Sequence, residues 1–549
     1  MIKTLRILAA AAIGIAAVSC ASAEKMAEMA ENVVIKCNPE ILEAAGGQIK
    51  ADVSVTYPAD YFNPKAILEV TPVIVYNGGE AKHPVLKYQG EKVKDNFKVV
   101  SSAGQTVNEK LTFDYVEGME KCYLELRGVV KAKKKSFKLP ARKVADGCNT
   151  TYMLVKDEGT VSFKADNYKD VITESPEGQI LYNVNSAEVR SSELKSKSIK
   201  DFQAMLDAIK ANDKATLKGT EIVSYASPEG AEDLNNKLSG KRSESAGKAW
   251  KDIVKGHEAT DPEIKSVGED WEGFQKLVSE SDIEDKELIL RVLSMYSDPA
   301  VRESEIRNMS EVFTTLKGEV LPELRRARFI ANVEYANYTS EELIDLIDKN
   351  IDILDEEALL RAATLVKDAS KKEAIYNKAA DKYDSDRARF NLGALYLSQG
   401  KDAKAEKAFK KVKEKDGDLE NALGVLALRE GDLATAEKHF KAAGTDDAKT
   451  NMGVVDILNG NYEKAAQELV NAKGCCHNTA LAYLLNDDLD KAEAAIHCKS
   501  PECTYLRAII AARRGDAAGV RKYVEAAGKA DKKLKERAAN DIEFAGYDL

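Results

Sequence analysis

Six side chains that are able to bond to one another or to a metal lie close together in the C-terminal part of the sequence. They are Cys475, Cys476, His477, His497, Cys498 and Cys503. Paired thiols form disulfides in oxidising compartments, whereas clustered thiolates and imidazoles bind zinc. The adjacent thiols of Cys475 and Cys476 lack the C-x-x-C spacing with which two thiolates usually share one metal. The cluster is therefore open to three interpretations: a disulfide, free buried thiols or a metal site.

Motifs of common catalytic sites are missing from the sequence. It contains no HExxH, no GxSxG and no phosphate-binding P-loop. The remaining histidines, His83, His257 and His439, fall in polar stretches. The net charge of −10 disfavours nucleic acid as a partner, because phosphate binding needs a basic surface. We therefore expect no enzymatic activity, no cofactor, no bound metal and no nucleic-acid partner.

Residues 1–23 have the pattern of a secretory signal peptide. Two basic residues precede the apolar run 7–18, and Ala21-Ser22-Ala23 is a small-residue cleavage site. The run is too short to span a bilayer. Val18-Ser19-Cys20 resembles a bacterial lipobox, except that Ala17 replaces the usual Leu. The leader predicts export, either with a lipid anchor on Cys20 or with cleavage after Ala23.

Export bears on the cysteines near the C-terminus. Because exported proteins meet oxidising conditions, we favour at least one disulfide between the pair Cys475 and Cys476 and the pair Cys498 and Cys503. Free buried thiols are the second interpretation, and a metal site is the third.

Residues 31–155 show the alternation of apolar and polar residues that is typical of strands with one buried face. In 49–56, Ile, Ala, Val and Val alternate with Lys, Asp, Ser and Thr. Further runs, separated by Pro, Gly and Asn, are 66–75, 97–100, 111–115, 123–130 and 136–139. This spacing predicts an all-β sandwich of the immunoglobulin-like type.

A polar stretch, 156–177, is interpreted as a linker, and strand and helix patterns alternate after it over 178–337. Strands are expected at 180–184, 217–224 and 329–333, and helices at 199–211 and 234–254. The order β-α-β-α-β predicts parallel strand pairing under covering helices. The helical pattern over 268–325 is interpreted as an insertion before the last strand.

This α/β region contains a motif that could hold a ligand. The loop Ala226-Ser-Pro-Glu-Gly230 follows the middle strand, and Asn235, Leu238, Ser239 and Arg242 follow at helical spacing. The composite resembles the OmpA-like C-terminal domain, which binds peptidoglycan without a covalent bond. Arg325-Arg326 before the last strand and Asn183-Val-Asn-Ser-Ala near the first also match that family.

The resemblance implies a peptidoglycan site formed by Ser227, Glu229, Asn235 and Arg242. In the family, an arginine binds the carboxylate of diaminopimelate and an aspartate binds its ammonium group. Arg242 matches the arginine, but Ser227 replaces the aspartate, so Glu229 is the candidate carboxylate. The alternative is a module that has become a structural spacer.

Residues 340–549 lack strand patterns and contain an internal repeat. A small residue recurs on the first helix of each unit, and Ala and then a large apolar residue recur on the second. The small residues are Gly393, Gly424, Gly453 and Ala480, and the large ones are Phe409, Phe440, Leu469 and Ile496. This register resembles the tetratricopeptide repeat, although its period of 27 to 31 residues is shorter than 34. An all-α solenoid is predicted.

Together these patterns predict a multidomain scaffold of the cell envelope. In the first hypothesis, Cys20 anchors it to the periplasmic face of the outer membrane, the OmpA-like domain contacts peptidoglycan, and the repeat groove binds a protein partner. In the second, it is an accessory subunit of an outer-membrane assembly, secretion or surface-fibre complex, with a non-binding OmpA-like spacer. An unrecognised hydrolase is the third and least favoured.

Overall fold

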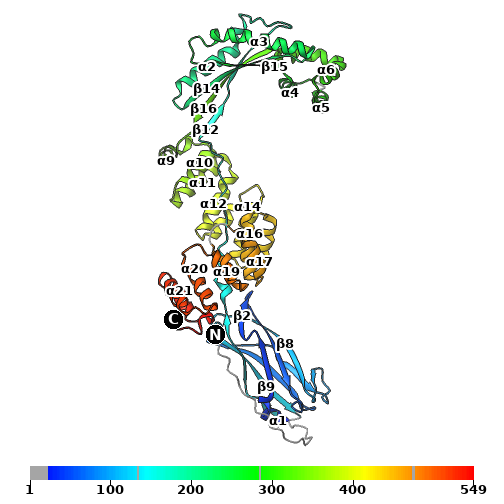
Figure 1. The fold of residues 1–549 in the computed structure, drawn as a ribbon, viewed down its shortest axis with the longest axis vertical. Helices are drawn as coiled ribbons and strands as arrows, with labels where there is room; N and C mark the ends of the chain where they lie inside the picture. Colours follow the sequence, from blue (N-terminus) through cyan, green and yellow to red (C-terminus); the bar gives the residue numbers. More distant parts are fainter. Residues whose placement is uncertain (1–22, 133–134, 284–285, 473–475) are drawn as a thin grey trace. The chain divides into compact units, whose positions relative to one another are not determined.

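The computed structural model describes residues 23–132, 135–283, 286–472 and 476–549 (Figure 1). Cys20 with the rest of the leader, and Cys475, lie outside these ranges. The chain forms two compact units: Met1–Lys164 with Ala380–Leu549, and Ala165–Ala379. We call them the first and the second unit. In the described ranges, no helix combines the length and the apolar character needed to cross a membrane.

Strands of the first unit form one continuous 11-stranded sheet. They are β1 (Val34–Asn38), β2 (Ile41–Ala45), β3 (Gln48–Tyr57), β4 (Ile67–Tyr76), β5 (Gly79–Lys82), β6 (Leu86–Gly90), β7 (Lys98–Val100), β8 (Gln105–Asp114), β9 (Cys122–Ala132), β10 (Lys135–Lys138) and β11 (Arg142–Asn149). The strands expected from the alternation pattern are present. However, β2 pairs antiparallel with β3 and parallel with β11, so it joins the two ladders that an immunoglobulin-like sandwich keeps as separate sheets.

The core of this sheet continues into the C-terminal helices of the same unit. Cys148 and Tyr152 from the end of the β region belong to one apolar cluster with Tyr505 and Phe544. The Glu543 carboxylate accepts hydrogen bonds from Asn149 Nδ2 at 2.9 Å and from Thr151 Oγ1 at 3.0 Å. Segments almost 400 residues apart in the sequence therefore fold as one body.

Helical hairpins make up the rest of the first unit. The helices are α12 (Asp386–Ser398), α13 (Asp402–Phe409), α14 (Gly417–Arg429), α15 (Leu433–Ala443), α16 (Asp446–Leu458), α17 (Tyr462–Leu469), α18 (His477–Leu485), α19 (Leu489–Ala495), α20 (Pro501–Arg513), α21 (Ala517–Ala530) and α22 (Lys532–Ala538). A Cβ added at Gly424 would lie 2.5 Å from Phe440 Cε1, and Gly393 meets Phe409 in the same way. The predicted register of small and large residues in a tetratricopeptide-like array is confirmed.

The second unit contains a mixed sheet with the order β12-β16-β14-β15, in which β13 also pairs with β16. Its strands are β12 (Val171–Glu174), β13 (Glu177–Leu181), β14 (Ala215–Ala226), β15 (Glu263–Glu269) and β16 (Arg326–Ala336). α2 (Lys197–Ala211) and α3 (Glu232–Ile253) contribute Phe202 and Trp250 to the core on its buried face.

The prediction of parallel pairing was wrong for most of this sheet. Only β14 and β15 are parallel, because β16 lies between β13 and β14 and runs antiparallel to both. The pattern also missed β15, five of whose seven residues are exposed and lack an apolar alternation.

Further helices complete the second unit. The predicted insertion consists of α4 (Trp271–Glu280), α5 (Lys286–Met295), α6 (Pro299–Asn308), α7 (Ser310–Glu319) and α8 (Leu321–Leu324). They have a core of their own around Phe274 and Leu316. After β16 come α9 (Ser340–Lys349), α10 (Glu356–Leu365) and α11 (Ala369–Tyr383), in which the boundary between the two units falls.

Candidate functional site

Asparagine recurs on the first helix of four successive hairpins of the array. α12, α14, α16 and α18 contribute Asn391, Asn421, Asn451 and Asn478, of which the first three are buried. The first three helices have side-chain N-caps, namely Ser385, Asp416 and Thr445. Each cap fixes the residue at which its helix begins, and therefore the face of the helix on which the asparagine lies. A buried carboxamide needs hydrogen-bond partners, and these four find them on one peptide.

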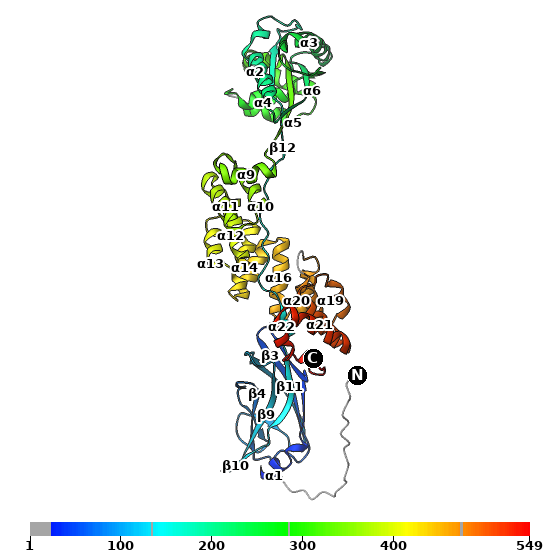
Figure 2. The same cartoon turned by 90° about the vertical axis from the view of Figure 1, so that its left-hand side faces the viewer.

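That peptide is the chain's own segment 156–164, which follows β11 and runs along the array (Figure 2). The amide of Lys156 donates to Asn478 Oδ1 and its carbonyl accepts from Nδ2, both at 2.8 Å. Thr160 makes the same two bonds with Asn451, both at 2.8 Å. Lys164 makes them with Asn391, at 2.7 and 2.9 Å. Every fourth residue of the segment is thus held through its backbone.

The middle contact is reinforced by a second carboxamide. Asn421 Nδ2 donates to the Thr160 carbonyl at 2.9 Å, and its Oδ1 accepts from Asn451 Nδ2 at 2.8 Å. We call each pair of hydrogen bonds between one asparagine side chain and the backbone of one segment residue a clamp. Each clamp replaces the two hydrogen bonds that a neighbouring strand would supply. Because only backbone groups are bound, these contacts recognise extended peptide rather than a particular side-chain sequence.

Charged groups fix the segment at its ends. Lys164 Nζ pairs with Asp416 and lies 5.2 Å from the centre of the Phe390 ring. Burial opposes ionisation of Asp416, but the hydrogen bonds from Lys164 and from the Leu419 amide outweigh it and lower its pKa. At the other end, Lys156 Nζ lies 2.8 Å from Glu502 Oε1.

Gly159 gives the segment a shape that matches the array. Its φ is +71°, a conformation that other residues adopt at a cost. A Cβ at this position would lie 2.7 Å from Val425 Cγ1, so a side chain has no room. Both the positive φ and the close approach of Val425 favour a glycine at this point of the segment.

These contacts correct one expectation and bear on a second. The stretch 156–177 was interpreted as a plain linker, but 156–164 belongs to the packed first unit. The groove expected to receive a protein partner is occupied, along the four asparagines, by the chain itself. The signal was present in the sequence, because asparagine recurs at 391, 421, 451 and 478. It was missed because a polar residue on a helix usually faces solvent.

The residues expected to bind peptidoglycan lie in the second unit, and Arg242 is fully buried there. Its guanidinium donates to three backbone carbonyls, those of Tyr225 at 2.8 Å, Ser186 at 3.0 Å and Asn183 at 3.2 Å. It also stacks on Tyr182, 5.0 Å from the ring centre. Burial lowers its pKa to about 10. These contacts occupy the guanidinium in a structural role.

The other three expected ligands also bond to groups of the second unit. Ser227 Oγ donates to Glu229 Oε1 at 2.8 Å, and Arg325 Nε lies 3.2 Å from the same oxygen. Asn235 Nδ2 donates to Glu269 Oε1 at 2.8 Å. The four expected residues therefore form no single cluster of unused donors and acceptors.

The loop that carries Ser227 and Glu229 is also covered by the helical insertion. The Gly230 amide donates to Glu303 of α6 at 2.6 Å. Pro228 lines an internal space of about 10 Å³ together with Trp271, Phe274 and Ile306, too small for a sugar or peptide ligand.

Three of the cysteines considered above converge in the first unit. The Sγ atoms of Cys476, Cys498 and Cys503 lie within 4.8 Å of one another, with no disulfide bond between them. The favoured disulfide is therefore not formed among these three, while Cys475 lies outside the described residues. His497 is directed elsewhere, because its Nδ1 lies 3.0 Å from the Ala495 carbonyl.

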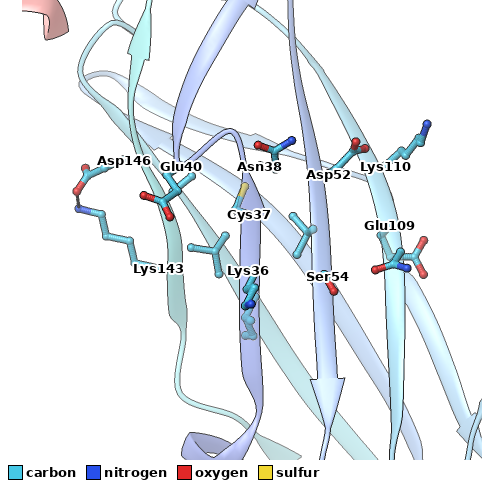
Figure 3. A pocket seen from close by; sticks show the side chains of 15 residues that line it. Lys36, Cys37, Asn38, Glu40, Asp52, Ser54, Glu109, Lys110, Lys143 and Asp146 are labelled. Carbon is cyan, nitrogen blue, oxygen red and sulfur yellow. Dashed lines mark ion pairs between the residues drawn. The ribbon is translucent and has the colours of Figure 1, made fainter. Parts of the chain in front are cut away.

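Residues of β1, β3, β8 and β11 line an open hollow of about 990 Å³ in the first unit. Figure 3 shows their side chains. Both acidic and basic side chains line it, and Lys143 forms an ion pair with Asp146 at 2.6 Å. Burial and the nearby Asp52 raise the pKa of the Cys37 thiol to about 11, which makes it a poor nucleophile at neutral pH. No histidine is among the residues that line it.

Comparison with known protein families and with curated proteins found no match. Among solved structures, the chain is similar to a tetratricopeptide repeat protein from Parabacteroides merdae (15% identity over 37% of this chain and 91% of that one, TM-score 0.29). It is also similar to PilF of Pseudomonas aeruginosa (12%, 36% and 98%, TM-score 0.28) and to the Cut9–Hcn1 complex (12%, 62% and 80%, TM-score 0.30).

Proposed function

We propose that this protein is a non-enzymatic scaffold of the cell envelope whose repeat array holds the chain's own segment 156–164. The observation that carries the proposal is the set of two-bond clamps from Asn391, Asn451 and Asn478 to the peptide backbone. Tetratricopeptide-type arrays are suited to protein-protein interaction, and here the array makes such an interaction within one chain. The clamp joins the β region to the helices as one body.

The leader supports the envelope location. A basic start, a short apolar run and the lipobox-like Val18-Ser19-Cys20 are features of an exported lipoprotein. We propose attachment through Cys20 at the periplasmic face of the outer membrane. Radiolabelled palmitate incorporation, absent in a Cys20→Ala variant, tests this attachment; an unmodified mature chain that begins at Glu24 contradicts it.

For the second unit we propose an OmpA-like module that serves as a spacer, so that the protein is an accessory subunit of a larger outer-membrane assembly. The OmpA-like assignment is supported by Gly230, Asn235 and Arg242, and by the mixed sheet with two helices on its buried face. The spacer role is supported by the internal contacts of Arg242 and Glu229. Sedimentation of the full chain with purified peptidoglycan tests it: the spacer stays in the supernatant, and co-sedimentation supports the peptidoglycan hypothesis instead.

Hydrogen–deuterium exchange of the full chain tests the clamp directly. The amides of Lys156, Thr160 and Lys164 should exchange far more slowly than those of a free peptide, because each is bonded to a carboxamide. The double variant Asn421→Ala, Asn451→Ala should accelerate exchange at Thr160. Asn377→Ala is the control, since this exposed side chain bonds only to the Glu373 carbonyl of its own helix. Rapid exchange of the segment in the wild type would refute the proposal.

A further inference from the structure

Three sulfur atoms meet at one end of the array. Cys476 directly precedes α18, Cys498 lies between α19 and α20, and Cys503 is in the first turn of α20. Cys503 Sγ lies 3.0 Å from Cys498 Sγ and 3.7 Å from Cys476 Sγ. Cys476 and Cys503 are buried, and Cys498 is half-buried. Three separate positions in the chain therefore each place one thiol at the same point.

The 3.7 Å between the Cys476 and Cys503 sulfur atoms matches the spacing of ligands around a metal ion, whereas the 3.0 Å between Cys498 and Cys503 is shorter. Four ligands placed tetrahedrally at a Zn–S distance of about 2.3 Å have sulfur atoms roughly 3.8 Å apart. A disulfide requires about 2.05 Å, shorter than both measured separations. A disulfide would also use two of the three thiols and leave the third buried beside it. A site for one thiophilic ion uses all three.

His477 lies on the remaining side of the cluster. Its Nε2 is 2.6 Å from the Leu154 carbonyl, which only accepts, so Nε2 carries the proton and Nδ1 keeps its lone pair. Nδ1 is 4.0 Å from Cys503 Sγ. Histidines that bind metals are commonly oriented in this way, with the second nitrogen bonded to a backbone carbonyl.

We propose that Cys476, Cys498 and Cys503 bind one Zn²⁺ ion as thiolates, with His477 facing the fourth coordination position. Such an ion ties the start of α18 to the loop before α20. Through His477 and Leu154 it also fixes the end of the β region, just before the segment 156–164 begins. This structural site replaces the disulfide expected from the sequence and is independent of the clamp.

The test is metal binding by the full chain, prepared reduced and freed of metal. We expect one equivalent of Zn²⁺ per chain, and with Co²⁺ a near-ultraviolet sulfur-to-metal band together with the intense visible bands of a tetrahedral site. Cys498→Ser should weaken binding at least tenfold and reduce the sulfur band. Because Cys498 is only half-buried, this variant should keep the fold, which circular dichroism checks. Cys503→Ser gives a second, fully buried test position.

Cys148→Ser is the matched control, because this buried thiol lies in the β region outside the cluster. It should leave stoichiometry, affinity and spectrum unchanged. The proposal is overturned if the reduced wild type takes up no stoichiometric Zn²⁺, or if Cys498→Ser and Cys503→Ser bind as tightly as Cys148→Ser, which would indicate an adventitious ion only. A Cys498–Cys503 disulfide in protein isolated from cells without reductant would overturn it as well.

Discussion

The carboxamide of Asn451 forms two hydrogen bonds with the backbone of Thr160, a residue that precedes it by 291 positions. Replacing it by Ala leaves the amide of Thr160 without its partner at a part-buried contact. We expect Asn451→Ala to lower the free energy of unfolding of the first unit by about 1–3 kcal/mol. Thermal denaturation followed by circular dichroism measures this. A change equal to that of Asn540→Ala would contradict it, since Asn540 is an exposed residue of the first unit that bonds to the nearby Glu536 carbonyl.

Gly159→Val should release the segment while leaving every residue of the array unchanged. The substitution places a side chain where Val425 Cγ1 already lies 2.7 Å from an added Cβ, and φ at this position is +71°. We expect faster amide exchange over 156–164 and cleavage there by added protease. Gly47→Val is the control, because its φ is also positive, at +72°, but an added Cβ meets no atom within 4 Å. Equal protection of 156–164 in the two variants would exclude a role for the close contact.

Gly424→Ala should destabilise the array by overpacking. The new methyl group would lie 2.5 Å from Phe440 Cε1, and such strain costs about 1–3 kcal/mol. Gly240→Ala, inside α3, meets no atom within 4 Å and should be neutral or stabilising, since Ala favours helix over Gly. Both tryptophans, Trp250 and Trp271, lie in the second unit. Their fluorescence transition should stay unchanged in Gly424→Ala while the circular dichroism transition shifts.

Arg242→Met should lower the stability of the second unit. A residue that served only to bind a ligand would leave that stability unchanged. The substitution removes the donor of one buried and two part-buried carbonyls, at a cost of about 3 kcal/mol. Lys241→Met, one residue earlier and exposed, is the control for loss of charge. Denaturant titration followed by tryptophan fluorescence separates them. Equal midpoints would show that the Arg242 contacts contribute nothing to stability.

Acid should loosen the segment at its Lys164 end. The pKa of Asp416 is lowered from 3.8, so its ion pair stabilises the folded state above that value and is lost as pH falls below it. Asp418 acts in the opposite sense, because burial and the charge of Asp416 raise its pKa. We expect amide exchange at Lys164, corrected for intrinsic rates, to accelerate as the pH falls below 3.8. Asp416→Asn should show fast exchange already at neutral pH and a flatter profile. A profile identical to that of the wild type would contradict the assignment.

Features that depend on contacts between residues near in sequence were predictable, and those that depend on distant contacts were not. The register of Gly393 and Gly424 was predictable, because each packs on a side chain 16 positions later in the same hairpin. Strand β3 was predictable from its own alternation. The antiparallel position of β16 was not, since it depends on insertion between two strands far from it in sequence.

The contacts of the predicted site residues were hidden from the sequence for the same reason. Arg242 matched a ligand-binding motif in type and spacing, but its actual partners are the carbonyls of Asn183, Ser186 and Tyr225. The sequence alone does not distinguish an arginine that binds a ligand from one whose guanidinium donates hydrogen bonds to backbone carbonyls. The asparagines of the array differ from Arg242. Their recurrence can be read from the sequence, and only the segment that they bind had to come from the structure.

The clamp also sets an order of events during synthesis. Lys164 and Lys156 are bound by residues that follow them by 227 and 322 positions, so the peptide leaves the ribosome long before the helices that hold it. Closing such long loops is slow, because chain entropy opposes contacts between distant residues. The β region meanwhile exposes the apolar surface around Tyr152 that Tyr505 and Phe544 later cover. A nascent or truncated chain that lacks its last hairpins leaves this apolar surface exposed and is therefore expected to need a holding chaperone.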